Sequence, residues 1–283
     1  QFGHKVCLKP INKGDPIIKY DQIIGFASKN ITAGEHVHSH NLEFKEFDRE
    51  FQVKNKKTIV DEKVDTFFNG ILRDNGQVAT RNYIGIVSTV NCSATVTKMI
   101  VEKIKYSNIL NDYPNIDGIV PITHSTGCGM NTVSEGMQMF QRTIDGFKNH
   151  PNFSHVFVIG LGCECAQVSL FDESVKKHNR IHFLTIQDEG GTKKIVEKVL
   201  SQIKNLLPEA NKIKRTPQSV SHLTLALQCG GSDGYSGITA NPALGVAADL
   251  LVKKGGSSIL SETPEIYGAE HLLINRANSQ KTA

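Results

Sequence analysis

Apolar segments of the strand type alternate with amphipathic segments of the helix type through the middle of this chain. Residues 83–90, 116–123, 155–161, 181–186 and 222–227 are rich in β-branched and aliphatic side chains, as strands buried on both faces are. The segments between them place apolar residues on one helical face, namely Val96, Met99, Ile100 and Ile104, then Val133, Met137, Phe140, Ile144 and Phe147, then Ile195, Val199, Ile203 and Leu206. This alternation predicts an α/β fold built on a parallel sheet.

Soft and polar side chains follow these predicted strands. They are Cys92, His124, Cys128, Cys163, Glu164, Gln187, Asp188, Cys229 and Asp233. In an open parallel sheet, ligands bind beyond the carboxyl ends of the strands. The pattern therefore predicts one site that combines thiols, an imidazole and carboxylates.

Composition excludes several classes of protein. The formal charge is +4 and the lysines form no aromatic-interleaved stripe, so we expect no nucleic-acid partner. No apolar run approaches the roughly 20 residues that cross a bilayer and the amino end lacks a signal-peptide layout, so we expect no membrane partner and a cytoplasmic location. Six cysteines in 283 residues are too few for a disulfide scaffold, and in a reducing compartment clustered thiols more often bind metal or do chemistry.

Turn and helix signals predict the domain organisation. Residues 1–45 contain short strands joined by turns at 12–15 and 32–34, which indicates a small β module. Residues 46–66 lack a sustained period and are interpreted as a linker. The α/β domain is expected over 67–215, and 216–283 as the start of a further, truncated domain. The first residue, Gln1, and the polar tail at 275–283 suggest a fragment.

Two segments at strand ends carry candidate catalytic or metal-binding groups. His124 and Cys128 offer a nitrogen and a sulfur ligand in one loop, a combination suited to iron or zinc, although a structural role is the alternative. No Cys-x-x-Cys pair exists, which disfavours structural zinc. Glu164 beside Cys163 is a candidate general base or metal ligand, and a carboxylate at a helix start is the alternative.

Two further segments are candidate substrate-binding elements. Arg81 and Asn82 precede the first strand of the α/β domain, where a planar cation can bind a substrate carboxylate or form a surface salt bridge. The glycine-rich run at 228–245 lets backbone approach an anion or forms a structural turn, and it matches neither nucleotide-binding pattern.

Three histidines alternate in the amino-terminal module. His36, His38 and His40 share one face if residues 35–40 form a strand. Such a face is either a metal or proton-transfer site or an exposed polar surface.

Several motifs, taken together and in order, resemble the altronate dehydratase and galactarate dehydratase family. They are GHKVCLKPINKGDPIIKY (3–20), GEHVHSHN (34–41), TRNYIGIVSTVNC (80–92), THSTGCG (123–129), HPNF (150–153), IGLGCE (159–164) and QCGGSDGYSGITANPALG (228–245). The resemblance covers almost the whole chain. It implies an amino-terminal SAF domain, which is a β-clip-like module, then a central α/β domain and the beginning of a carboxyl-terminal domain.

The resemblance also implies an activity. Family members are hydro-lyases that dehydrate sugar acids, and GEHVHSHN is more similar to the altronate enzymes. We therefore expect D-altronate to be converted to 2-dehydro-3-deoxy-D-gluconate, with galactarate or a similar aldarate as the alternative substrate and sulfolactate sulfo-lyase chemistry as a related one. Iron(II) or manganese(II) is the expected cofactor, and an iron–sulfur cluster held by the cysteines is the alternative. A small sugar acid is the expected partner, and a homo-oligomer is left open.

The site roles follow as a hypothesis. A metal holds the substrate carboxylate and 2-hydroxyl, a base removes the C2 proton, and an acid protonates the departing 3-hydroxyl. The expected catalytic residues are His38, His40, His124 and Glu164, the expected substrate-binding residues are Arg81, Asn82, Gly230, Gly231, Ser232 and Asp233, and the expected metal ligands are Cys92, His124, Cys128, Cys163 and Cys229. The non-enzyme alternative is a binding fragment whose cysteines are small buried hydrophobes.

Overall fold

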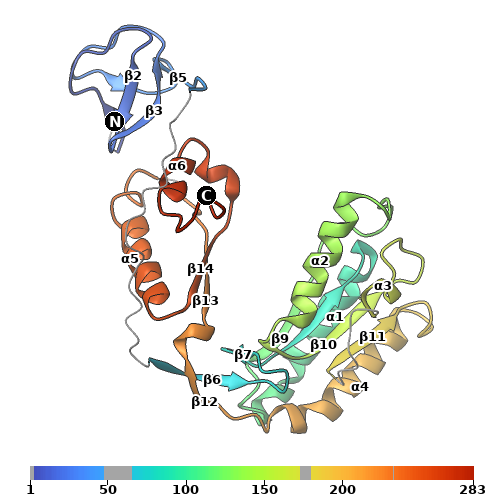
Figure 1. Cartoon of the computed structure of the whole chain (residues 1–283). Coiled ribbons are helices and arrows are strands. Elements are labelled where there is room, and N and C mark those ends of the chain that lie inside the picture. The colour runs from blue at the N-terminus through green and yellow to red at the C-terminus, as the bar shows by residue number, and fades with distance from the viewer. Residues whose placement is uncertain (1–2, 48–65, 173–179, 232) are drawn as a thin grey trace. The chain divides into compact units, whose positions relative to one another are not determined.

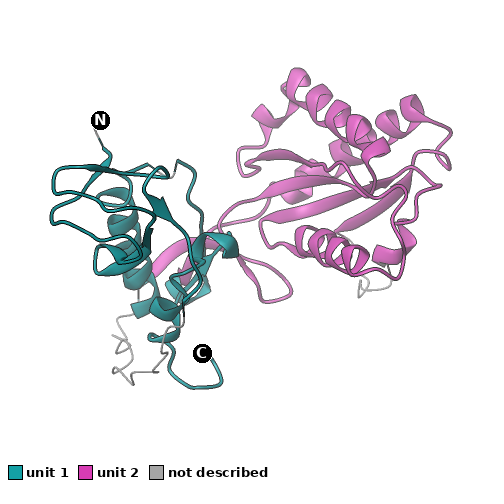
Figure 2. Cartoon of the chain, turned by 90° about the horizontal axis from the view of Figure 1, so that it is seen from above, with its two compact units in different colours: residues 1–66, 220–283 teal, residues 67–219 magenta. Residues whose placement is uncertain are grey.

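The computed structural model describes residues 3–47, 66–172, 180–231 and 233–283 (Figure 1). The chain divides into two compact units, of which one combines residues 1–66 with 220–283 and the other spans residues 67–219 (Figure 2). Most of the predicted linker, residues 48–65, lies outside the described ranges.

A four-stranded parallel sheet forms the centre of the second unit. Its strand order is β11 (Ile181–Thr185), β10 (Phe153–Gly160), β8 (Tyr83–Ser88) and β9 (Gly118–Ile122). These strands are the apolar runs predicted at 83–90, 116–123, 155–161 and 181–186, so the predicted parallel α/β fold is confirmed. The chain passes from β8 to β9 and then returns to β10 on the other side of β8.

Helices cover both faces of this sheet (Figure 2). On one face, α1 (Asn91–Ser107) and α4 (Thr192–Ala210) bury Ile100 and Val199 against Ile86 and Phe157. On the other face, α2 (Glu135–Asn149) and the short α3 (Ser169–Asp172) pack on the alternate strand residues. A 3-10 turn, Ile109–Asp112, follows α1. Because both faces are covered, the strands are apolar throughout.

The predicted helical faces are correct at most positions, with three differences, one of which is Phe147, 37% exposed near the end of α2. Val133 is exposed and precedes α2, because the Ser134 hydroxyl accepts a hydrogen bond from Met137 N at 3.2 Å and so caps the helix start. Met99 lies at the margin of the buried face of α1 and is 36% exposed.

A small antiparallel sheet closes the central unit. It consists of β12 (Thr216–Ser219), β6 (Phe67–Leu72) and β7 (Val78–Ala79), with Ser219 opposite Phe67. Because β12 pairs with β6, the central unit extends to residue 219 and not to 215 as predicted.

The amino-terminal module contains five short strands. β2 (Pro16–Lys19), β3 (Gln22–Ala27) and β5 (Leu42–Glu43) form one sheet, while β1 (Lys5–Val6) pairs with β4 (His36–Val37). Cys7, Ile17, Ala27, Ile31 and Val37 form its core. The predicted small β module is therefore present.

The carboxyl-terminal segment has its own two-stranded parallel sheet. β13 (Thr224–Leu227) pairs with β14 (Ser257–Leu260), and α5 (Ala240–Lys253) connects them. The remaining elements are 3-10 turns at Val220–His222 and Thr263–Ile266 and a short α6 (Glu270–Ile274). The run at 222–227 is thus a strand, but it does not belong to the four-stranded sheet. None of the helices in the described ranges is both long enough and apolar enough to cross a membrane.

Candidate functional site

The loops after β8, β9 and β10 meet at the carboxyl edge of the four-stranded sheet. Asn91 N donates to Thr126 O at 2.8 Å, and Cys165 N donates to Cys128 O at 3.3 Å. The strand order reverses between β8 and β10, and ligands of open parallel sheets bind beside such a reversal. The edge therefore has the position of a binding site.

Glu164 holds this edge together. Its side chain is 2% exposed, and it accepts hydrogen bonds from Thr89 Oγ1 at 2.9 Å, Leu161 N at 3.0 Å and Gly162 N at 2.6 Å. The carboxylate thus joins the loop after β10 to the end of β8. In this arrangement Glu164 positions the loop, and its two oxygens are directed at backbone and hydroxyl donors.

Two glycines allow the loops to approach so closely. Gly127 has φ +99°, and a Cβ there would collide with Thr89 O. Gly162 has φ +125°, and a Cβ would lie 2.5 Å from Gln187 Oε1. A residue with a side chain would be strained at either position, so both glycines are required by the edge itself.

The hydrogen bonds of His124 define its tautomer. Nε2 lies 2.9 Å from Ser88 O, and a carbonyl only accepts, so Nε2 carries the proton. Nδ1 accepts from Thr126 N at 3.2 Å. The ring also packs edge-on against Phe140, with 4.8 Å between centroids. Since both nitrogens are in use, His124 would have to give up one of these bonds to ligate a metal or to transfer a proton.

Four thiols are exposed around this edge. Cys92 is the second residue of α1, Cys128 follows β9, and Cys163 and Cys165 follow β10. Thiolates and imidazoles are donors that iron accepts. However, within the described ranges no three or more His, Cys, Asp or Glu side chains are grouped so that they hold a metal ion. The residues of this edge, as arranged, therefore do not form a complete metal site.

Arg81 and Asn82 lie at the opposite edge of the sheet. They precede β8 whereas Cys92 follows it, and six strand residues span about 20 Å. Arg81 forms an ion pair with Asp117 at 3.1 Å. The buried Asn82 amide donates to Asn115 O and Ala210 O. The structure thus does not bring these two residues together with the four thiols.

The glycine-rich run begins after β13, in the other unit. Cys229 is partly exposed, and Gly230, Gly231 and Asp233 follow it in the loop that leads to α5. The Asp233 carboxylate accepts from Ser236 N at 3.0 Å and Tyr235 N at 2.8 Å, and these bonds hold its pKa below the ordinary value. Asp233 therefore organises its own loop. Ser232 lies outside the described residues.

Four histidines gather in the amino-terminal module. His4 Nδ1 lies 2.9 Å from His36 Nε2, so one ring donates a hydrogen bond to the other. The ring of His36 also lies 5.5 Å from the rings of His38 and His40, between centroids. The predicted strand ends at Val37, and a turn closed by Asn41 N and Leu42 N on His38 O brings His40 back to the cluster. The histidines thus meet through a turn and not through strand alternation.

Electrostatics within this histidine cluster favour one neutral ring. Burial lowers the pKa of His36, and positive charge on His4, His38 or His40 lowers it further. His38 and His40 are exposed. His36 therefore stays neutral to a lower pH than an ordinary histidine.

Three supporting residues escaped the sequence analysis. The fully buried Asn41 accepts from His38 N and donates to His36 O, each at 2.9 Å, and so holds the histidine turn. Thr89 holds Glu164. His4 joins the cluster from the motif at residues 3–20, where no role was predicted for it. Asn41 and Thr89 are polar residues inside the motifs at 34–41 and 80–92, and that was the available signal.

These observations define a modular α/β protein whose chemically active side chains collect at a sheet edge and in a small β module. Family models match along the chain: the altronate/galactarate dehydratase SAF domain at residues 1–45, the second domain of D-galactarate dehydratase/altronate hydrolase at 70–211, and the carboxyl-terminal domain of D-galactarate/altronate dehydratase at 220–283. The chain belongs to the altronate and galactarate dehydratase family.

Individual relatives agree with this assignment. The chain is 33% identical to an altronate dehydratase of Bacillus subtilis and 34% identical to one of Escherichia coli, in each case over 99% of the chain and 56% of the relative. It is 35% identical to the galactarate dehydratase (L-threo-forming) of Escherichia coli over 99% of the chain and 55% of that protein. The chain therefore spans about half the length of these relatives.

Proposed function

We propose that the protein carrying this chain is a sugar-acid dehydratase whose substrate is D-altronate and whose product is 2-dehydro-3-deoxy-D-gluconate. Family membership supports the reaction class. The altronate-like wording of residues 34–41 supports the choice of substrate, because the identities to altronate and galactarate dehydratases, 33–35%, do not discriminate between them.

The histidine cluster is the observation that carries the proposal. Loss of water from a 2,3-dihydroxy acid needs a base for the C2 proton and an acid for the departing 3-hydroxyl, and the resulting enol becomes the 2-keto acid. The ring of His36 lies 5.5 Å between centroids from the rings of His38 and His40, so the cluster places several imidazoles, which can act as acid or base, in one place. We assign His38 and His40, the exposed members, to proton transfer with the substrate.

The metal is a separate part of the proposal. Fe(II) or Mn(II) remains the expected cofactor, but the described residues supply no group of three donors, so we assign no ligand set and derive no step through a metal. Iron, manganese, zinc and acid-labile sulfide should be measured after anaerobic purification. Iron or manganese without sulfide is the expected result, while iron with sulfide would replace the mononuclear ion by a cluster on the cysteines.

Turnover of the two sugar acids tests the proposed function directly. D-altronate and galactarate should be compared under the same conditions, with the 2-keto acid product measured as its semicarbazone. We expect kcat/KM to be higher for D-altronate. A higher value for galactarate would reverse the substrate assignment, and no turnover of either would reject the dehydratase proposal.

Substitutions test the roles of the histidines. His38→Gln and His40→Gln should each lower kcat by about 100-fold or more if they transfer protons, and His222→Gln, an exposed histidine outside the cluster, is the matched control. Because burial and neighbouring histidines lower the pKa of His36, the NMR signals of its ring should titrate below the pH at which an ordinary histidine titrates. If neither substitution alters kcat, the cluster is not the acid–base site. If His124→Ala leaves turnover and iron content unchanged, His124 is neither ligand nor acid–base group.

A further inference from the structure

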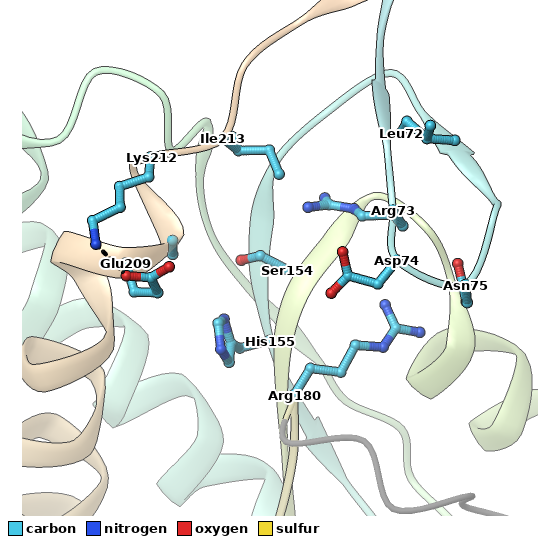
Figure 3. A pocket seen from close by; sticks show the side chains of 11 residues that line it. Leu72, Arg73, Asp74, Asn75, Ser154, His155, Arg180, Glu209, Lys212 and Ile213 are labelled. Atoms are coloured by element: carbon cyan, nitrogen blue, oxygen red, sulfur yellow. Dashed lines mark hydrogen bonds and ion pairs between the residues drawn. The ribbon is translucent and has the colours of Figure 1, made fainter.

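A pocket of about 430 Å³ opens at the amino edge of the central sheet (Figure 3). It is formed by the hairpin loop after β6, the start of β10, the residue before β11, and the end of α4 with the segment that follows. The polar side chains that matter for its chemistry are Arg73, Asp74, His155, Arg180, Glu209 and Lys212. All belong to the central unit, at the edge opposite the four exposed thiols.

Two arginines in this pocket are fixed by carbonyl and amide oxygens. Arg73 donates through Nε to Pro151 O at 2.8 Å and through both terminal nitrogens to Asn82 Oδ1 at 3.1 Å, and Nη2 also donates to Arg81 O at 3.2 Å, so one N–H of Arg73 remains for a ligand. Arg180 donates to Phe153 O at 3.1 Å and to Asn149 O at 3.3 Å. A guanidinium has five N–H groups, so these contacts with described residues leave three donors of Arg180 for a ligand.

Neither arginine forms an ion pair with a carboxylate of the described residues. In Figure 3 the one contact drawn between lining residues joins Lys212 to Glu209, at 2.6 Å. Asp74 is exposed, and Figure 3 draws its carboxylate between the two guanidinium groups, where it offsets part of their positive charge. Burial, together with the nearby positive charge of Arg180, lowers the pKa of Arg73 to about 10, and Asp74 acts in the opposite direction. The two positive charges thus repel each other in a partly desolvated place, and an anion between them would relieve that repulsion.

His155 adds a polar group without a partner. Its Nδ1 is buried and has no hydrogen-bond partner among the described residues. Burial lowers the pKa of His155 to about 4, with contributions from His182, Arg73 and Arg180. The ring is therefore neutral at pH 7 and adds no positive charge, but it can share a proton with a ligand oxygen.

We propose that this pocket is a binding site for a small oxyanion, a carboxylate or a phosphate, held by Arg180 and Arg73. Guanidinium groups donate charge-assisted hydrogen bonds to both kinds of oxyanion, and here Arg180 has three N–H groups for this purpose and Arg73 has one. The volume suits a small ligand. The site is separate from the histidine cluster and from the carboxyl edge, so it does not depend on the proposed dehydratase activity.

Calorimetric titration of the full chain tests the proposal. Phosphate and malonate are titrated in separate experiments at pH 7, which distinguishes the two kinds of oxyanion. Chloride keeps the ionic strength constant. Arg180→Gln should weaken binding of the preferred anion by about tenfold or more, because a charge-assisted contact is lost. Asp74→Asn should tighten it, because a nearby negative charge is removed. Arg142→Gln, which removes one charge from the exposed side of α2, should leave it unchanged.

Each outcome decides the proposal. Saturable binding of phosphate or malonate that responds to Arg180→Gln and Asp74→Asn in these opposite directions supports it. Absence of binding of both anions to the parent chain overturns it, and so does equal binding by the Arg180→Gln and Arg142→Gln variants. If Arg180→Gln fails to fold, Asp74→Asn alone is decisive, since unchanged affinity in that variant refutes a ligand beside the arginines.

Discussion

Replacement of Glu164 by glutamine should strongly destabilise the central unit. Each carboxylate oxygen accepts one backbone N–H, with Leu161 N 3.0 Å from Oε1 and Gly162 N 2.6 Å from Oε2. A glutamine offers one oxygen and one NH₂ group. Whichever way its amide turns, one backbone N–H then faces another donor. The side chain is 2% exposed, so water cannot take the place of the lost oxygen.

The expected loss of stability follows from these contacts. One charge-assisted hydrogen bond is lost, which costs roughly 1.5–3 kcal/mol. The other two hydrogen bonds lose their charge and each become weaker by about 1 kcal/mol. The free energy of unfolding should therefore fall by roughly 3–5 kcal/mol. With an m-value of about 2 kcal/mol/M, the urea midpoint followed by circular dichroism should fall by about 1.5–2.5 M.

The control is Glu102→Gln on the exposed side of α1, which should change the free energy of unfolding by less than about 0.5 kcal/mol. A Glu164→Gln variant as stable as this control would show that the carboxylate does not anchor the loop. The reasoning about the carboxyl edge would then be refuted. Glu164 would then be left with the predicted role of general base or metal ligand.

Three further predictions concern stability. Gly127→Ala should cost about 1–3 kcal/mol because of its positive φ and the close carbonyl, whereas Gly129→Ala, with no atom within 4 Å, should be nearly neutral in the same urea assay; equal midpoints would contradict this. Asn41→Ala should cost about 2–3 kcal/mol and alter the histidine NMR signals of the amino-terminal module; unchanged spectra would mean that the turn holds without it. The pKa of His155 is lowered, to about 4, so its contribution is present above pH 6.5 and is lost as pH falls towards 4, by at most about 1.4 kcal/mol per pH unit. Urea midpoints at pH 7 and pH 5 should converge in His155→Gln, and an unchanged difference would exclude this residue as the cause.

The parallel sheet was predictable because its strands are buried on both faces. Ile84, Ile86, Val87, Val156 and Val158 are almost completely buried, so the sequence has to be apolar without interruption, and that is the signal that marks a parallel strand. The residues after each strand were then assigned to one edge by the geometry of parallel strands alone. The hydrogen bond from Cys165 N to Cys128 O joins the loops after β10 and β9, which carry the predicted Cys163 and Cys128.

The partners of each element could not be predicted in the same way. The run at 222–227 has the composition of a strand, but strand composition does not specify a neighbour, and β13 pairs with β14. Arg81 and Asn82 stand at the start of β8, where they serve an ion pair and a buried amide network. The position of His40 depends on a turn that the buried Asn41 stabilises, which a pattern of alternating residues does not contain.

The two ends of the central unit lie side by side. Phe67 and Ser219 are paired across β6 and β12, and Val220 N donates to Thr66 O at 2.9 Å. A segment whose ends are neighbours can be removed or exchanged with little disturbance to the chain on either side of it. Residues 67–219 therefore have the geometry of an inserted domain, whose two ends leave the rest of the chain at neighbouring points. Exchange of this domain for another with neighbouring ends would replace the parallel sheet and the chemistry at its edges, while the flanking segments would still meet at residues 66 and 220.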